Sequence, residues 1–298
     1  MISRRRVLAG LLGIGNISLI GCSNRPASPV TASQPAPAQP PNAMFAPNIS
    51  SARIIDAMID ISHSVRVSDF GLARERSNIL AVFHKATEGG DWQDPLYAER
   101  RAKAKDAGML WGAYHFGTRQ YSGADQANNF LATAQPGPDT LLALDLELNE
   151  RIPANTMSIS QAEEFVQTIQ TLTGRLPLLY THPSWADGKR TGPGGRSLGA
   201  AISPQSILAQ CDLWLADYRN QPQLPIAWAT KGWRFWQYAG EGARPVAPAE
   251  SPVRGVSGVE RCDRNLFLGD TVALTSYWGT GTGGTAPGIN RQLISSNI

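Results

Sequence analysis

Cysteine is scarce in this sequence of 298 residues, which contains only Cys22, Cys211 and Cys262. No cysteine and histidine residues have the spacing of a metal site, so we expect neither a metal nor another cofactor. In an exported protein Cys211 and Cys262 could pair, but buried free thiols are an equally good interpretation. Strong charge is missing too. The net charge is +3, and the basic footprint of a nucleic-acid-binding protein is absent.

An apolar run from Val7 to Ile20 follows three arginines at positions 4–6, and residues 1–21 contain no acidic residue. The run is short and interrupted by glycines, which is typical of an export signal rather than of a lasting transmembrane helix. Residues 3–8 look like a twin-arginine signal. Residues 19–22 resemble a bacterial lipobox, in which Cys22 is lipidated and attaches the protein to a membrane. A plain cleaved signal with an incidental cysteine is the alternative.

Residues 22–50 are rich in Pro, Ala, Ser and Gln. Such a segment cannot bury enough apolar surface to fold, and it predicts a semi-rigid linker that holds a domain away from a membrane. Ser23 follows Cys22 where an Asp would retain a lipoprotein at the inner membrane. In a Gram-negative cell we therefore expect the periplasmic face of the outer membrane. We predict one folded domain over residues 51–278 and a flexible tail over residues 279–298.

Short apolar segments alternate with helical ones along the predicted domain. We predict strands at residues 54–62, 79–85, 109–116, 140–147, 176–181, 213–218, 233–238 and 263–268. We predict helices at residues 96–107, 123–134 and 158–172, the last capped by Ser158 or Ser160 with Glu163 placed as in a capping box. Alternation of this kind is typical of parallel β/α construction, and about eight strands suit a barrel. Loop-like segments at residues 188–203 and 240–258 favour an irregular β/α barrel, so the fold class is α/β.

Two carboxylates, Asp145 and Glu147, lie among leucines in the segment 141–148. In a strand, alternation places both acids on one face and Leu144, Leu146 and Leu148 on the other. Acids at the end of a buried strand are costly unless they are used or paired. Glycoside hydrolysis uses two such carboxyl groups, one of which protonates the leaving oxygen. A capping or salt-bridged acid pair is the alternative.

Three more acids lie at or near predicted strand ends: Asp60, Asp217 and Asp263. In a parallel β/α barrel the carboxyl ends of the strands line one face, where catalytic groups gather. Converging carboxylates repel one another, which raises the pKa of at least one and lets it act as a general acid. Each of the three could instead be a cap or a turn residue.

Eight short motifs occur in one order and span about residues 54 to 277. They are Ala57–Ser62, Phe83–Gly89, Gly112–Phe116, Leu144–Glu147, Pro177–Tyr180, Leu213–Tyr218, Phe235–Tyr238 and Asp263–Phe267. Each motif alone is weak, but the ordered set resembles the glycoside hydrolase family 25 lysozymes, the Chalaropsis-type muramidases. The loop at residues 188–203 looks like an insertion relative to that pattern and puts the depth of the cleft in doubt.

The resemblance implies an irregular, flattened β/α barrel that hydrolyses the β-1,4 bond between N-acetylmuramic acid and N-acetylglucosamine in peptidoglycan. It implies that Glu147 is the proton donor, that Asp145 assists it, and that Asp60 and Asp263 lie on the floor and flank of the cleft. The positions implied to face the sugar are Tyr114, Tyr180, Tyr218 and Gln237. We expect a monomer whose partner is the glycan strand. A catalytically weak peptidoglycan-binding lipoprotein of the same fold is the alternative.

Other conspicuous residues are expected to be structural. Glu88 follows a strand in a loop, and His115 alternates with Tyr114 on the opposite strand face, which favours a hydrogen-bonded packing role. Trp214 and Trp233 could stack on sugars, but their strand positions favour core packing. Trp92 lies in a loop, where its exposure decides whether a sugar can reach it.

Overall fold

The computed structural model describes residues 53–189, 201–240 and 255–280. The export signal, Cys22 and the linker predicted over residues 22–50 lie outside the described residues. So do nearly all of the predicted tail and most of the two predicted loops. Among the described helices, none is long and apolar enough to cross a membrane.

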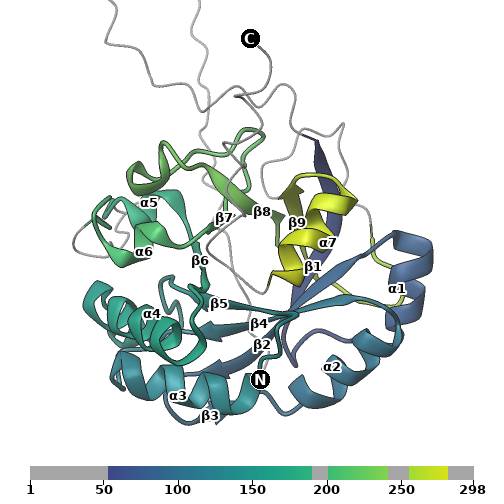
Figure 1. Ribbon diagram of the computed structural model, residues 1–298, viewed down its shortest axis with the longest axis horizontal. Helices are drawn as coiled ribbons and strands as arrows, with labels where there is room; N and C mark the ends of the chain where they lie inside the picture. Colours follow the sequence, from purple (N-terminus) through teal and green to yellow (C-terminus); the bar gives the residue numbers. More distant parts are fainter. Residues whose placement is uncertain (1–52, 190–200, 241–254, 281–298) are drawn as a thin grey trace, which may run out of the picture. The chain divides into compact units, whose positions relative to one another are not determined.

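Eight of the described strands close into a barrel (Figure 1). They are β1 (Ile54–Ile61), β2 (Ala81–Glu88), β4 (Leu110–Phe116), β5 (Thr140–Asp145), β6 (Leu178–Thr181), β7 (Leu213–Ala216), β8 (Trp233–Ala239) and β9 (Asp263–Leu268). Their order is β1-β9-β8-β7-β6-β5-β4-β2, and the pairing of β1 with β2 closes the ring. Strand β3 (Trp92–Gln93) pairs only with β2, as a short hairpin. The predicted single-domain barrel is confirmed.

Strand β9 departs from the predicted all-parallel construction. It pairs antiparallel with both β8 and β1, whereas the other pairs of barrel strands are parallel. An antiparallel strand needs no crossover to the far end of the barrel, so β9 starts at the end where β8 finishes. Its first residue, Asp263, therefore lies at the carboxyl ends of the parallel strands, opposite Asp60 of β1.

The helices cover the barrel unevenly. They are α1 (Phe70–Ser77), α2 (Tyr97–Asp106), α3 (Gly123–Ala134), α4 (Ile159–Thr173), α5 (Pro183–Ala186), α6 (Ile207–Gln210) and α7 (Thr271–Gly279), with 3-10 turns η2 (Pro153–Asn155) and η3 (Ile226–Trp228). The shortness of α5 and α6 agrees with the predicted irregular second half. Helix α4 begins with a capping box, but its partners are Ser158 and Gln161. Glu163 instead accepts a hydrogen bond from the Ser206 hydroxyl (2.6 Å), so its predicted capping role is wrong.

Two apolar layers hold the domain together. The outer layer lies between strands and helices and includes Leu144 of β5 and Leu146 just after that strand. Helix α3 approaches α4 closely because Gly123 has no side chain; a Cβ there would lie 2.1 Å from the Gln161 carbonyl oxygen. The inner layer fills the barrel with aromatic side chains, among them Phe83 and Trp214, whose rings stack 4.5 Å apart.

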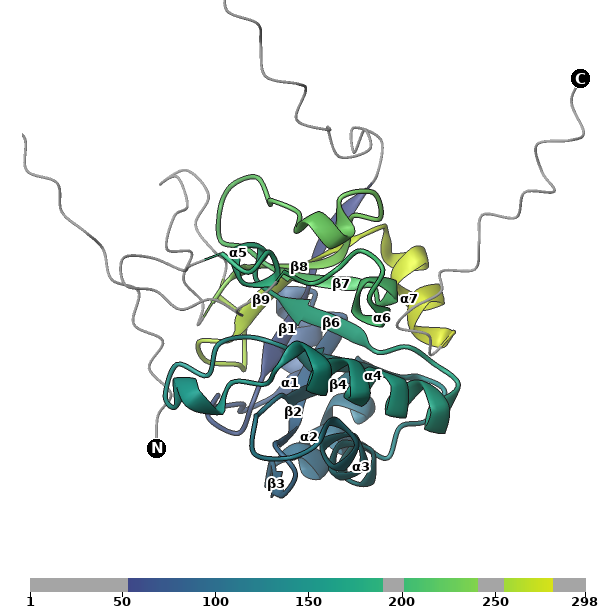
Figure 2. The same cartoon turned by 90° about the vertical axis from the view of Figure 1, so that its left-hand side faces the viewer.

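Helix α7 plugs the end of the barrel at which the parallel strands begin. Its Trp278 indole donates a hydrogen bond to the carbonyl of Trp111, near the start of β4 (2.8 Å). The Tyr277 hydroxyl donates to Asp212, which immediately precedes β7 (2.8 Å). Figure 2 shows α7 and α5 at opposite ends of the strands. The plug leaves the other end, where the strand-end acids lie, as the mouth of the barrel.

Candidate active site

The Asp145–Glu147 pair faces the mouth of the barrel. Asp145 is the last residue of β5 and is 5% exposed. Glu147 lies two residues past the strand, but the Leu146 amide still donates to the Tyr180 carbonyl (3.0 Å), so this segment continues alongside β6. Since Leu144 and Leu146 are in the outer layer, alternation turns both acids towards the barrel interior.

Asp60 and Asp263 are held together by neutral amides. They lie opposite each other in the β1–β9 register. The Gln237 side-chain nitrogen, on β8, lies 3.1 and 2.9 Å from the two Asp60 oxygens and 3.4 Å from one Asp263 oxygen. The Asn265 side chain donates another hydrogen bond to Asp60 (2.8 Å). Amide donors stabilise the ionised form of a buried carboxyl group without adding charge.

The oxygen of the Gln237 amide also has two hydrogen-bond partners. It accepts hydrogen bonds from the hydroxyls of Tyr180 (3.0 Å) and Tyr218 (2.9 Å). Gln237 is predicted to face the sugar, yet its side chain is fully buried. One glutamine thus joins the two tyrosines to Asp60 and Asp263. The structure brings five of the eight predicted site residues into this Gln237 network.

Tyr114 and Asp145 connect to the same region through neighbouring strands. Tyr114 is half-buried in β4, with its ring 6.3 Å from that of Trp214 in an edge-on arrangement. Trp214 in turn stacks edge-on against Tyr180 (5.0 Å) and donates its indole hydrogen to Asn265 (2.7 Å). Asp145 lies directly opposite Tyr180 in the β5–β6 register. All eight predicted residues therefore lie at or beside the mouth of the barrel.

The sequence analysis missed His182. Its Nε2 lies 3.0 Å from Oε2 of Glu147, and its ring lies edge-on to Tyr180 at 5.9 Å. The contact follows from the strand register: Asp145 is opposite Tyr180, and the residue two places further along each chain comes next on the same face. The sequence alone does not indicate this contact, because the contact depends on the β5–β6 register.

Asp217 belongs to a turn and not to the acid cluster. Both of its carboxylate oxygens contact the Arg219 guanidinium (2.8 and 2.7 Å), and the Gln223 amide donates to one of them (2.8 Å). Of the three additional strand-end acids, only Asp60 and Asp263 join the network around Gln237. The alternative of a turn residue is correct for Asp217.

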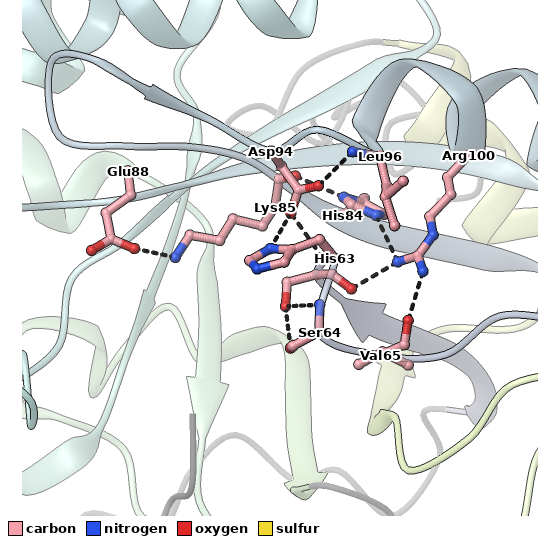
Figure 3. Close-up of polar contacts among 10 residues, drawn as sticks. His63, Ser64, Val65, His84, Lys85, Glu88, Asp94, Leu96 and Arg100 are labelled. Atoms are coloured by element: carbon pink, nitrogen blue, oxygen red, sulfur yellow. Dashed lines mark hydrogen bonds and ion pairs between the residues drawn. The ribbon is translucent and has the colours of Figure 1, made fainter. Parts of the chain in front are cut away.

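Glu88 and Trp92 lie at the end of β2 and in the paired strand β3. Figure 3 shows Glu88 beside Lys85, and His63 beside Asp94. Glu88 forms an ion pair with Lys85 (2.5 Å), in line with the expected structural role. The Lys85 ammonium also lies 5.2 Å from the ring centre of Trp92, which is half-buried. The ring of His63 lies 5.3 Å from that of Trp92, and Asp94 holds this histidine through its Nδ1 atom (3.1 Å).

The buried residues His115, Trp214 and Trp233 have packing roles. His115 is fully buried between Thr87 (2.8 Å) and Gln126 (3.1 Å), and burial lowers its pKa to about 3. Trp214 and Trp233 are buried, in agreement with core packing.

The cysteine alternatives are resolved in favour of buried free thiols. Cys211 and Cys262 are unpaired, and burial raises the pKa of each thiol to about 12. Within the described ranges, no group of three or more His, Cys, Asp or Glu side chains could hold a metal ion.

Comparison with known proteins gives one consistent answer. Residues 59–245 match the family described as glycosyl hydrolases family 25. Lysozyme M1 of Streptomyces globisporus is 29% identical over 235 residues, which cover 72% of this chain and 69% of that protein. The muramidase of Trichobolus zukalii superposes with a TM-score of 0.59 at 25% identity, covering 75% of this chain and 98% of that one. The muramidase of Acremonium alcalophilum superposes with a TM-score of 0.56 at 28% identity, covering 74% and 97%.

Proposed function

The chain belongs to glycosyl hydrolase family 25, and on this premise we propose that it is a peptidoglycan lysozyme. It cleaves the β-1,4 bond between N-acetylmuramic acid and N-acetylglucosamine. The observation that carries the proposal is the placement of Asp145 and Glu147 on one face at the mouth of the barrel, beside the network around Gln237. The similarity to proteins named lysozyme and muramidase supports this substrate.

Glu147 is the proposed general acid. Its side chain is 13% exposed, so it is mostly withdrawn from water but still open to a ligand in the mouth. It gives its proton to the glycosidic oxygen as the bond from that oxygen to the sugar carbon breaks. Water supplies the hydroxyl group of the new reducing end. Asp145, more deeply buried, assists at the sugar, and the Gln237 network keeps Asp60 and Asp263 in place beneath the glycan.

The test is clearance of purified peptidoglycan, followed as turbidity, by wild type, Glu147→Gln and Asp217→Asn. Loss of general acid catalysis is expected to lower the rate for Glu147→Gln at least about a hundredfold. Asp217→Asn is the matched control, because it removes another strand-end acid that serves a turn. Its clearance rate should stay within about twofold of wild type, because Asp217 pairs with Arg219 and lies outside the Gln237 network.

Mass spectrometry of the released fragments identifies the bond. Muramic acid at the new reducing ends supports the proposal, and glucosamine there contradicts it. Equal clearance by wild type and Glu147→Gln removes Glu147 from the mechanism. No clearance by wild type, combined with tight retention on peptidoglycan, favours the alternative of a binding protein with the same fold.

We propose separately that the enzyme is an exported lipoprotein attached through Cys22 and facing the periplasm from the outer membrane. The support is the lipobox-like sequence at residues 19–22 and the proline-rich linker after it. Expression with a labelled fatty acid tests this. Label should enter the wild type but not Cys22→Ala, and the variant should leave the membrane fraction. Label in neither protein rejects lipid attachment.

A further inference from the structure

His182 directly contacts the side chain of the proposed proton donor. Its Nε2 lies 3.0 Å from Oε2 of Glu147, within hydrogen-bonding distance. The side chain of His182 is 34% exposed, against 13% for Glu147. The histidine, which follows β6, is therefore the more exposed member of the pair.

The position of the imidazole is fixed from several sides. Pro183 follows and favours an extended backbone at His182, which has φ −95° and ψ 148°. The carbonyl of His182 accepts a hydrogen bond from the Ala186 amide (2.9 Å), which ties it to α5. The Tyr180 ring packs edge-on against the imidazole, with the two ring centres 5.9 Å apart.

The imidazole does not serve the helix that it precedes. His182 is the N-cap residue of α5, yet its side chain makes no capping hydrogen bond. Its Nε2 is directed to Glu147. Helix capping therefore does not account for the orientation of the ring.

We infer that His182 is a positioning residue that orients the Glu147 carboxyl group and shares its catalytic proton. The inference rests on the proposed role of Glu147 as general acid. The pair holds one proton, either on Oε2 of Glu147 or on Nε2 of His182. Glu147 gives this proton to the glycosidic oxygen as the carbon–oxygen bond breaks. Water adds its hydroxyl group to the sugar carbon, and its other proton returns to the pair through the exposed edge of His182.

A shared proton changes the pH dependence. Because both groups hold the same proton, removal of His182 alters the pH dependence of the step in which Glu147 acts as an acid. Among the described residues, the ionisable groups on adjacent elements include Asp145 on β5, Tyr180 on β6, the Asp187–Lys189 pair after α5, and the Asp217–Arg219 pair after β7. The last two are ion pairs, so they contribute little net charge near His182.

Two substitutions separate orientation from proton sharing. His182→Gln places an amide nitrogen where Nε2 now lies, so it keeps a hydrogen bond to Glu147 but cannot hold the proton. His182→Ala removes both contributions. The kinetic parameters kcat and KM on soluble peptidoglycan fragments are measured from pH 4 to pH 9 for wild type and both variants, with melting temperatures to verify folding.

For His182→Gln we expect kcat on the acidic side of the optimum within about threefold of wild type, and the alkaline limb moved down by about one pH unit. For His182→Ala we expect the same displacement of the limb and a kcat about tenfold lower or more, with KM within about twofold, because ground-state binding is untouched. His63→Gln is the matched control, since His63 also contacts a carboxylate (Asp94, 3.1 Å) and is 41% exposed. Its alkaline limb should stay in place.

The outcomes distinguish the two proposals. An inactive wild type overturns the proposed function itself. An active wild type whose alkaline limb is unchanged in folded His182→Gln and His182→Ala proteins overturns the role of His182 alone. A displacement of the same size in His63→Gln does so too, because the effect would not be specific to the contact with Glu147.

Discussion

Replacing Gln237 by glutamate tests the centre of the site with a change of one heavy atom. Glutamate has the shape of glutamine, but as a carboxylate it cannot donate to Asp60. The Gln237 nitrogen lies 2.9 Å from one Asp60 oxygen and 3.4 Å from an Asp263 oxygen. An ionised Glu at position 237 would therefore place a third negative charge against two others in a fully buried place.

The size of the effect follows from Coulomb's law. Two unit charges about 3 Å apart at an effective dielectric constant of about 20 repel by about 5 kcal/mol. That repulsion raises the pKa of the introduced carboxyl group well above its usual range. The group would therefore stay protonated in the native state well above pH 4 and ionise only in the unfolded state. Its protonated form can still donate one hydrogen bond to Asp60, so the penalty at low pH is small.

The sign of the pH dependence is fixed by these states. A carboxyl group whose pKa is raised by folding costs no stability below its unfolded pKa, and the cost grows as the pH rises towards the folded pKa. Relative to wild type, the free energy of unfolding of Gln237→Glu should be nearly unchanged at pH 4.5. It should be lower by about 5 kcal/mol at pH 8, a loss that grows by about 1.4 kcal/mol per pH unit above pH 4.5.

Urea unfolding at pH 4.5, 6 and 8, followed by tryptophan fluorescence, measures this difference. Gln237→Met is the control: it removes the amide without adding a third charge, so its penalty should vary with pH much less than that of Gln237→Glu. If Gln237→Glu carries the same penalty at all three pH values, the side chain at position 237 does not face Asp60 and Asp263. That result would contradict the hydrogen bonds from Gln237 to these two acids.

Three further predictions concern the scaffold. Gly123→Ala should lower the free energy of unfolding by about 3 kcal/mol, because the added Cβ would overlap the backbone of α4; a wild-type urea midpoint would contradict this. Below pH 6.5 the stability should fall by about 1 kcal/mol per pH unit on account of His115, because the unfolded state binds a proton that the native state, with a pKa of about 3, refuses; equal urea midpoints at pH 7 and pH 5 would contradict it. Cys211 and Cys262 should resist a thiol reagent such as dithionitrobenzoate in the native protein and react fully in urea, since burial raises both thiol pKa values to about 12.

Most strands could be predicted from the sequence because buried parallel strands are short, apolar runs between helices. The direction of β9 could not, since a strand has the same composition whether it runs up or down. Its direction appears only in three dimensions, in its antiparallel pairing with β8 and β1. Helix α7 was missed for another reason. Its apolar residues show no amphipathic periodicity, because it packs against one end of the barrel.

The acids of the site were accessible from sequence because strand ends of a β/α barrel converge, and a D-x-E spacing keeps both carboxyl groups on one strand face. The contacts among them were not. Gln237 was expected to face a sugar, but its partners come from β1, β6, β9 and the end of β7, and such a meeting of distant segments has no local signature. His182 was hidden for the same reason, since its meeting with Glu147 depends on the β5–β6 register.

The seam between β1 and β9 joins the first and last strands of the described barrel. Contacts between segments so far apart in sequence form late in folding, because a long loop must close first. Asn265, which holds Asp60, belongs to this seam, and the plug helix α7 follows it directly. During synthesis the ribosome must therefore release nearly the whole domain before the site is complete. A chain that ends before residue 263 would keep the Asp145–Glu147 segment but lose the strand that organises the opposite wall, so unfinished copies should be inert.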